Sequence, residues 1–177
     1  MNIVLLEPEI PYNTGNIGRT CAAVGAALHL IRPLGFDTDD KAVKRAGMDY
    51  WKDVDVRYYD NFQDFIIRCG LNDPNNTARL FMSTTKAPRL YTDVSYKEGD
   101  FIMFGKESAG IPEPMLLQHI DTAVRIPMLD NRRSLNLSNS AAIVLYEALR
   151  QNGFKGLRFA GRFHHTFDNT EKGDFYD

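Results

Sequence analysis

Three segments of the chain combine glycine, serine or asparagine with charged side chains in a way that suits ligand binding. They are NTGNIGRT at Asn13 to Thr20, FGKESAGIP at Phe104 to Pro112, and IPMLDNRRSLNLSNSAA at Ile126 to Ala142. Glycine lets the backbone approach a ligand closely, and the free N–H groups at the start of a following helix favour an anion. Arg19, which directly follows Gly18, therefore points to a phosphate or a similar anionic group.

Each segment also has a plain structural interpretation. NTGNIGRT suits a tight turn before a capped helix, FGKESAGIP suits a glycine turn with Glu107 near a helix start, and the small residues 138–142 suit close helix–sheet packing. A serine hydrolase is weakly supported, because a nucleophile elbow needs G-x-S-x-G and Gly105 precedes Ser108 by three residues. The coincidence of three such segments in one chain favours a functional site.

The rest of the pattern predicts the elements that must position these segments. Short apolar runs predict strands at 2–7, 27–31, 54–59, 79–83, 101–104 and 123–126, and helical spacing predicts helices at 17–24, 39–47, 62–69, 112–118 and 138–151. Mostly non-alternating strands separated by helices are typical of a parallel sheet covered on both faces. Ligands of such sheets bind beyond the carboxyl ends of the strands, where we expect all three segments to lie.

Length and composition limit the class of protein. The 177 residues, 44% hydrophobic and 25% charged, fit one ordinary globular domain. No apolar run approaches the roughly 18 residues that span a bilayer, and the N-terminus lacks the pattern of a signal peptide, so we expect a cytoplasmic protein. The sequence has two cysteines and shows no pattern of zinc ligands, and we expect neither a disulfide nor a metal.

The charge distribution argues against non-specific coating of nucleic acid, because the formal net charge is −2. Local basic sites remain compatible with recognition of one structured RNA site. Such positive charge clusters in two places, at Lys41, Lys44 and Arg45 and at Arg132 and Arg133. For the first cluster, a solvated helix face is the simpler interpretation.

At these motifs the chain resembles the SPOUT class of RNA methyltransferases, most closely the small stand-alone tRNA (cytidine/uridine-34) 2′-O-methyltransferases. The resemblance extends from Met1 to about Gly153 and rests on EPEIPYNTGNIGRT, KAVKRAGMDYW, LFMSTTK, FGKESAGIP and IPMLDNRRSLNLSNSAAIVLYEALRQ, in that order. It implies a methyltransferase domain at 1–153, followed by an extension at 154–177 of uncertain order, beyond the usual end of the family. It also implies a parallel α/β sheet whose C-terminal part forms a deep trefoil knot.

The resemblance further implies the partners and the site. We expect S-adenosylmethionine as methyl donor, the anticodon stem-loop of a tRNA as substrate, and a homodimer with active sites at the interface. The implied cofactor-binding residues, largely acting through backbone groups, are Ser83, Gly105, Glu107, Ile126, Met128, Ser134 and Leu135. The implied catalytic residues are Asn13, Arg19, Ser134 and Asn136. Arginine stays protonated, so we interpret Arg19 as a clamp on the phosphate beside the 2′-hydroxyl and leave the general base unassigned.

Other functions remain open on the residues alone. A dinucleotide-dependent oxidoreductase would also place a glycine-rich loop after the first strand, but the chain lacks G-x-G-x-x-G there, and its second strand ends at Arg32 rather than at an acidic residue. A 2′-O-methyltransferase for another tRNA or rRNA position is a second alternative. A non-catalytic RNA-binding dimer that keeps the fold is a third.

Overall fold

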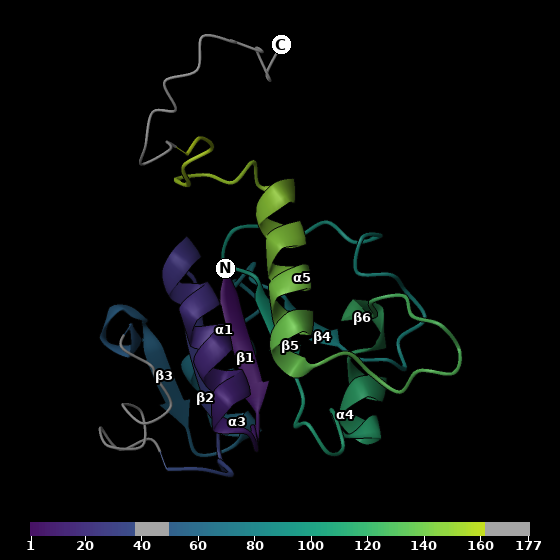
Figure 1. The fold of residues 1–177 in the computed structure, drawn as a ribbon. Coiled ribbons are helices and arrows are strands. Elements are labelled where there is room, and N and C mark those ends of the chain that lie inside the picture. The colour runs from purple at the N-terminus through teal and green to yellow at the C-terminus, as the bar shows by residue number, and fades with distance from the viewer. Residues whose placement is uncertain (38–49, 162–177) are drawn as a thin grey trace, which may run out of the picture.

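The computed structural model describes residues 1–37 and 50–161, in which strands and helices alternate along the chain (Figure 1). The strands are β1 Asn2–Leu6, β2 Ala27–Ile31, β3 Val56–Tyr59, β4 Leu80–Ser83, β5 Phe101–Phe104 and β6 Ala123–Val124. The helices are α1 Pro11–Val24, α3 Phe62–Arg68, α4 Glu113–Gln118 and α5 Leu137–Gln151, with 3-10 turns η1 Trp51–Asp53 and η2 Ile120–Thr122.

The strands form one parallel sheet in the order β3-β2-β1-β5-β4-β6. This confirms the predicted α/β class. β1 lies in the middle and pairs with β2 on one side and with β5 on the other. The helices that follow β1 and β5 pack on opposite faces of the sheet, so the connections leaving these neighbouring strands diverge at the carboxyl edge. Such a divergence is where open parallel sheets usually bind ligands.

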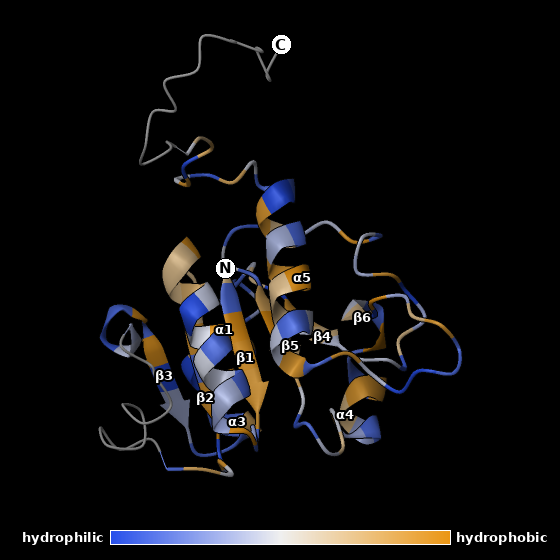
Figure 2. Cartoon of the chain, in the orientation of Figure 1, coloured by the Kyte–Doolittle hydropathy of each residue, from blue (hydrophilic) through white to orange (hydrophobic). Residues whose placement is uncertain are grey.

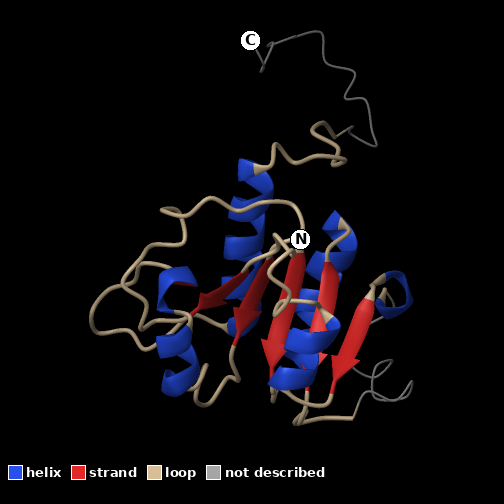
Figure 3. Cartoon of the chain, turned by 180° about the vertical axis from the view of Figure 1, so that it is seen from behind, coloured by secondary structure: helices blue, strands red, loops and turns tan. Residues whose placement is uncertain are grey.

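Two hydrophobic layers hold the helices to the sheet, because successive strand residues face opposite sides. On β1, Ile3 and Leu5 belong to the cluster that contains the buried residues of α1 and α5, whereas Val4 and Leu6 belong to the cluster with Phe65 of α3. The two views of the fold show α1 and α5 side by side on one face and the shorter helices behind it (Figures 1 and 3). Much of β1 is coloured as hydrophobic, whereas α1 and α5 carry hydrophilic residues on the visible outer side (Figure 2).

Most predicted elements agree with the structure to within two residues, and the caps of α3 are confirmed. Asn61 accepts a hydrogen bond from the backbone N–H of Asp64, and Gly70 follows the helix with φ of 66°. One prediction is wrong in a way that matters for the site, because α1 begins at Pro11 rather than near Ile17. A proline at the first helical position suits a helix start, since its missing N–H would be unpaired there anyway. The predicted helix at 39–47 lies outside the described residues.

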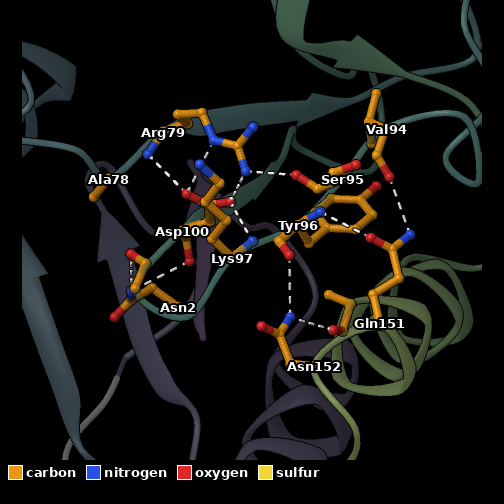
Figure 4. A network of polar contacts seen from close by, with 12 residues as sticks. Asn2, Ala78, Arg79, Val94, Ser95, Tyr96, Lys97, Asp100, Gln151 and Asn152 are labelled. Carbon is orange, nitrogen blue, oxygen red and sulfur yellow. Dashed lines mark hydrogen bonds and ion pairs between the residues drawn. The ribbon is translucent and has the colours of Figure 1, made fainter.

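A long connection, residues 84–100, joins β4 to β5 and contacts the C-terminal end of α5 (Figure 4). Gln151 accepts a hydrogen bond from the backbone N–H of Tyr96 and donates to the carbonyl of Val94, and Asn152 donates to the carbonyl of Tyr96. Near its middle, Leu90 forms a bridge with Arg125, just beyond β6. This connection is therefore fastened to both the end of β6 and the end of α5.

The amino edge of the sheet carries an ion pair between a buried carboxylate and a partly exposed guanidinium. The carboxylate of Asp100 is 1% exposed and lies 2.5 Å from a guanidinium nitrogen of Arg79. It also accepts the backbone N–H groups of Arg79 and Lys97 at 3.0 and 2.8 Å. Asn2, at the start of β1, donates to the carbonyls of Gly99 and Asp100. These bonds hold the start of β5 and the end of the 84–100 connection in place (Figure 4).

None of the helices in the part of the chain that the structure describes is long and apolar enough to cross a membrane.

Candidate active site

A pocket of about 710 Å³ opens at the carboxyl edge of the sheet. The segments that follow β4, β5 and β6 line it, together with the first turns of α1 and α5. Every residue that the sequence suggested for the site, apart from Arg19, lines this pocket: Asn13, Ser83, Gly105, Glu107, Ile126, Met128, Ser134, Leu135 and Asn136. Segments far apart in the sequence therefore come together at the carboxyl ends of the strands, as the sequence predicted.

Gly105 is required by close backbone packing at the floor of the pocket. A Cβ at this position would lie 2.1 Å from the carbonyl carbon of Gly110 and 2.3 Å from the amide nitrogen of Ile111. The backbone of residues 105–111 thus folds back on itself, closed by a hydrogen bond from the N–H of Gly110 to the carbonyl of Lys106. Gly110 has φ of 71°, a left-handed conformation that suits glycine. At Gly105 and Gly110, which both line the pocket, the hairpin has no side chain.

A reciprocal pair of glutamates joins this hairpin to the start of α1, and we call it the glutamate clamp. The carboxylate of Glu107 accepts the backbone N–H groups of Glu9 and Ile10, at 2.8 and 3.2 Å, and the side-chain amide of Asn13 at 2.9 Å. The carboxylate of Glu9 in turn accepts the N–H and the hydroxyl of Ser108, at 2.8 and 2.7 Å. The hydrogen bonds from Ser108 hold the pKa of Glu9 below its ordinary value.

An ion pair between Lys106 and Glu7 lies beside the glutamate clamp. The ammonium of Lys106 lies 2.8 Å from the carboxylate of Glu7, and this hydrogen bond raises the pKa of Lys106. Both side chains are about one-third exposed, so solvent screens their attraction. The pair orients the two connections that leave β1 and β5 rather than contributing much stability.

Asn136 extends the clamp to α5. Its side-chain oxygen accepts the backbone N–H groups of Ser138 and Asn139, which makes it the N-cap of the helix, and also the hydroxyl of Ser138. Its amide nitrogen donates to the side-chain oxygen of Asn13 at 3.0 Å. A continuous chain of hydrogen bonds therefore runs from Glu107 through Asn13 and Asn136 to the first turn of α5. Leu137 and Ser140 of that turn line the pocket beside the cap.

The expectation for NTGNIGRT needs correction. The segment is not a loop, because Asn13 to Thr20 all lie within α1. Gly15 and Gly18 are buried in the helix and do not line the pocket, so they do not let backbone approach a ligand there. A Cβ on Gly18 would lie 2.9 Å from the ring of Trp51, which explains the glycine by packing. Only Asn13, in the first turn, reaches the pocket.

Arg19 is exposed on α1 and is not among the residues that line the pocket of its own chain. Its guanidinium carbon lies 4.9 Å from the ring centroid of Tyr50. Of the suggested RNA-binding residues, Arg132 and Arg133 are exposed and Arg133 lines the pocket. The other three, Lys41, Lys44 and Arg45, lie outside the described residues, as does 162–177 of the suggested extension.

Sequence reasoning missed several residues of the site. Thr84, Thr85 and Lys86 line the pocket directly after β4, and the rule that ligands bind beyond strand ends would have found them. No local pattern indicated Glu9, because its partner Ser108 is 99 positions away. Across 1–37 and 50–161, no group of three or more histidine, cysteine, aspartate or glutamate side chains is arranged to hold a metal ion.

Comparison with known proteins decides the family. The model of the SpoU rRNA Methylase family matches residues 1–146. The chain belongs to the SpoU rRNA Methylase family. The matched range contains the whole sheet, the pocket and the first two-thirds of α5. The SPOUT resemblance is thereby confirmed at the level of the family.

One named relative and two solved structures are informative. A tRNA (cytidine(34)-2′-O)-methyltransferase of Photorhabdus asymbiotica is 48% identical over 157 residues, which cover 88% of this chain and 96% of the relative. A solved structure from work on the 2-OH methylation of C/U34 on tRNA is 42% identical, with a TM-score of 0.77, and the match covers 86% of this chain and 95% of that one. An AdoMet-bound rRNA methyltransferase from Sinorhizobium meliloti is 26% identical, with a TM-score of 0.70 over 84% of this chain and 55% of that one.

Proposed function

We propose that this protein transfers a methyl group from S-adenosylmethionine to the ribose 2′-hydroxyl of nucleotide 34 in the anticodon loop of tRNA. The observation that carries the proposal is the pocket at the carboxyl edge, which brings together nine residues that the family resemblance implies. The similarity at 48% identity to a tRNA (cytidine(34)-2′-O)-methyltransferase, over nearly the full length of both chains, supports the substrate. A tRNA-modifying activity implies a cytoplasmic protein.

The pocket residues fit the methyl donor. The volume suits a ligand of this size, and the lining combines apolar side chains, Ile126, Met128 and Leu135, with the backbone of two glycines, Gly105 and Gly110. Apolar side chains would cover the adenine, while backbone N–H and C=O groups would recognise its edge. Ser83 and Ser134 would offer hydroxyl groups to the ribose or the amino acid part of the donor. When bound, S-adenosylmethionine supplies an electrophilic sulfonium methyl group.

The protein's own contribution to the reaction is mainly alignment of the ribose oxygen with that methyl group. Arg19 would clamp the adjacent phosphate through charge-assisted hydrogen bonds. It would not act as the general base, because a guanidinium keeps its proton at neutral pH and cannot take another. Asn13 and Asn136 are engaged with Glu107 and with the cap of α5, so we assign them the positioning of the pocket walls. Glu107 takes the same role, because three protein N–H donors occupy its carboxylate.

The proposal includes a homodimer in which Arg19 acts on the pocket of the other subunit. Arg19 does not line the pocket of its own chain, and α1 and α5 lie side by side with large apolar side chains exposed near them. These exposed residues are Ile10, Tyr12, Leu135, Ile143 and Tyr146. Several exposed apolar side chains on neighbouring elements are typical of a subunit interface.

The proposal also includes the trefoil knot. The segment after β6 lies beside Leu90 of the 84–100 connection, and the end of α5 bonds to Val94 and Tyr96 of the same connection. A chain that passes from β6 through this connection before forming α5 would make all of these contacts. Such threading would also bring the donor-binding residues 126–136 beside the ends of β4 and β5.

Mapping of the methylated nucleotide tests the substrate. The wild-type protein, incubated with labelled S-adenosylmethionine and bulk tRNA, should place label on the 2′-oxygen of nucleotide 34. Label at another tRNA position or only in rRNA would refute the assignment of the substrate while retaining the reaction. No transfer to either RNA would favour a non-catalytic RNA-binding dimer.

Mixed dimers test the division of the site between subunits. Arg19→Ala and Gly105→Ala should each give an inactive homodimer, because each removes one half of every site. Random mixing should restore about a quarter of the wild-type sites, since half of the dimers are mixed and each contains one intact combination. If Arg19 instead served its own pocket, every mixed dimer would stay inactive.

A further inference from the structure

Tyr50 lies against the same part of α1 that carries Arg19. The guanidinium carbon of Arg19 is 4.9 Å from the centroid of the Tyr50 ring, within the range of a cation–π contact. The hydroxyl of Tyr50 donates a hydrogen bond to the carbonyl of Gly15. We propose that Tyr50 is a positioning residue that orients Arg19 for methyl transfer, an inference that rests on the proposed function.

An exposed arginine needs such support to act as a phosphate clamp. Its long side chain samples many rotamers, and fixing it costs conformational entropy at the moment of substrate binding. A ring beneath the guanidinium restricts these rotamers before the substrate arrives. A cation–π contact uses the charge of the guanidinium and leaves its N–H donors available for phosphate oxygens. Tyr50 therefore suits the role better than an acidic partner, which would compete with the phosphate.

Tyr50 is itself held in place by the glycines of α1. In an α-helix the carbonyl of Gly15 also accepts the backbone N–H of Arg19, four residues later, so one acceptor ties both residues together. The next residue, Trp51, packs on Gly18, where a Cβ would lie 2.9 Å from the indole ring. Gly18 thus permits the close contact between η1 and α1, and the backbone carbonyl of Gly15 receives the Tyr50 hydroxyl. In the motif NTGNIGRT, Gly18 therefore serves packing rather than backbone approach to a ligand.

Two substitutions separate this role from a purely structural one. Tyr50→Leu removes the ring, whereas Tyr50→Phe keeps the ring and removes the hydrogen bond to Gly15. A positioning role through the ring predicts that Tyr50→Leu lowers the single-turnover rate of methyl transfer about fivefold, and that Tyr50→Phe stays within about twofold of wild type. The affinity for S-adenosylmethionine, measured by calorimetry, should be unchanged in both variants. A structural anchor predicts comparable losses in both variants, or a parallel loss of donor affinity, and either result would overturn the proposal.

A readout independent of activity completes the test. In the wild type and in Tyr50→Phe, the ring current should shift the NMR resonances of the Arg19 side chain upfield, and Tyr50→Leu should abolish this shift. An unshifted Arg19 resonance in the wild type would refute the contact. If the wild-type protein transfers no methyl group, both the proposed function and this role of Tyr50 are refuted. An active wild type whose rate survives Tyr50→Leu would remove only the role of Tyr50.

Discussion

At the amino edge of the sheet, Asp100 is 1% exposed and its carboxylate is enclosed by Arg79 and by backbone N–H groups. At the carboxyl edge, Glu107 and Glu9 also accept backbone N–H groups, but they join two connections that border an open pocket of about 710 Å³. The bonds of the amino edge all end within the protein. Those of the carboxyl edge hold the hairpin 105–111, which lines the pocket, against the start of α1. The same kind of bond therefore stabilises the fold at one edge and preorganises a pocket at the other.

This comparison predicts that changes at the carboxyl edge alter ligand binding, whereas changes at the amino edge alter stability. The largest expected effect is that of Gly105→Ala. Its Cβ would overlap the backbone of Gly110, so the hairpin must open and donor affinity should fall at least about 100-fold. Calorimetry with S-adenosylmethionine measures the loss. Gly161→Ala, where no atom lies within 4 Å of the added Cβ, is the matched control. Full donor affinity in Gly105→Ala would show that the hairpin does not form the pocket.

A comparably large effect, on stability rather than on binding, should come from the amino edge. Asp100→Asn removes the charge that faces Arg79 and replaces one accepting oxygen with an amide that faces N–H donors. We expect the free energy of unfolding to fall by about 3 kcal/mol, because these buried donors lose their acceptor. Urea denaturation measures this change. Donor affinity at low denaturant should stay within twofold of wild type, and a selective loss of affinity without destabilisation would contradict the separation of the two edges.

A buried histidine is linked to the amino edge through Asn2. His29 is fully buried in β2, with one ring nitrogen 3.2 Å from the side-chain oxygen of Asn2 and the other 2.8 Å from the hydroxyl of Tyr59. Asn2 uses its amide nitrogen toward the carbonyls of Gly99 and Asp100, so its oxygen accepts and Nε2 of His29 carries the proton. The neutral ring then accepts from Tyr59 through Nδ1. Burial lowers the pKa of His29 to about 4, with a further contribution from Arg57.

This histidine predicts a pH dependence of stability. The unfolded chain takes up a proton on His29 below about pH 6.5, whereas the folded chain does so only near pH 4. The stabilisation is therefore complete above about pH 6.5 and is lost as the pH falls toward 4, by up to about 3 kcal/mol. Denaturation at a series of pH values measures it. His29→Gln should flatten the profile between these limits, and an unchanged slope would assign the acid sensitivity to other groups.

A smaller effect is expected from Glu107→Gln. The substitution keeps the size of the side chain but turns one accepting oxygen into a donor that faces the N–H of Glu9 or Ile10. The start of α1 and the hairpin should then separate in part, and donor affinity should fall about tenfold. Calorimetry checks the affinity, with Glu98→Gln, an exposed residue paired with Lys155 away from the pocket, as control. Unchanged donor affinity would show that the glutamate clamp supports the start of α1 but does not shape the pocket.

The sequence predicted the strands and helices because they follow from local rules, whereas most pocket residues were implied by the resemblance of their motifs to a known family. Apolar runs indicated the strands, and the ends of parallel strands meet at one edge, so the segments that contain Gly105 and Ile126 were expected to lie together there. The start of α1 was misplaced because Asn13, Gly15 and Gly18 read as turn residues. Glu107 accepts a hydrogen bond from the side-chain amide of Asn13, 94 positions away, and Trp51 packs on Gly18. Neither contact has a local signal in the sequence.

The separation of donor binding from methyl transfer in Arg19→Ala tests the central claim most directly. Arg19 lies outside the pocket of its own chain, so removing its guanidinium should leave the affinity for S-adenosylmethionine within twofold of wild type. Single-turnover transfer to tRNA should fall at least about 100-fold, since the proposed phosphate clamp would be lost in the transition state. Measuring both quantities on one preparation gives the answer. Lost donor affinity, or retained transfer, would contradict the division of the site between the pocket and Arg19.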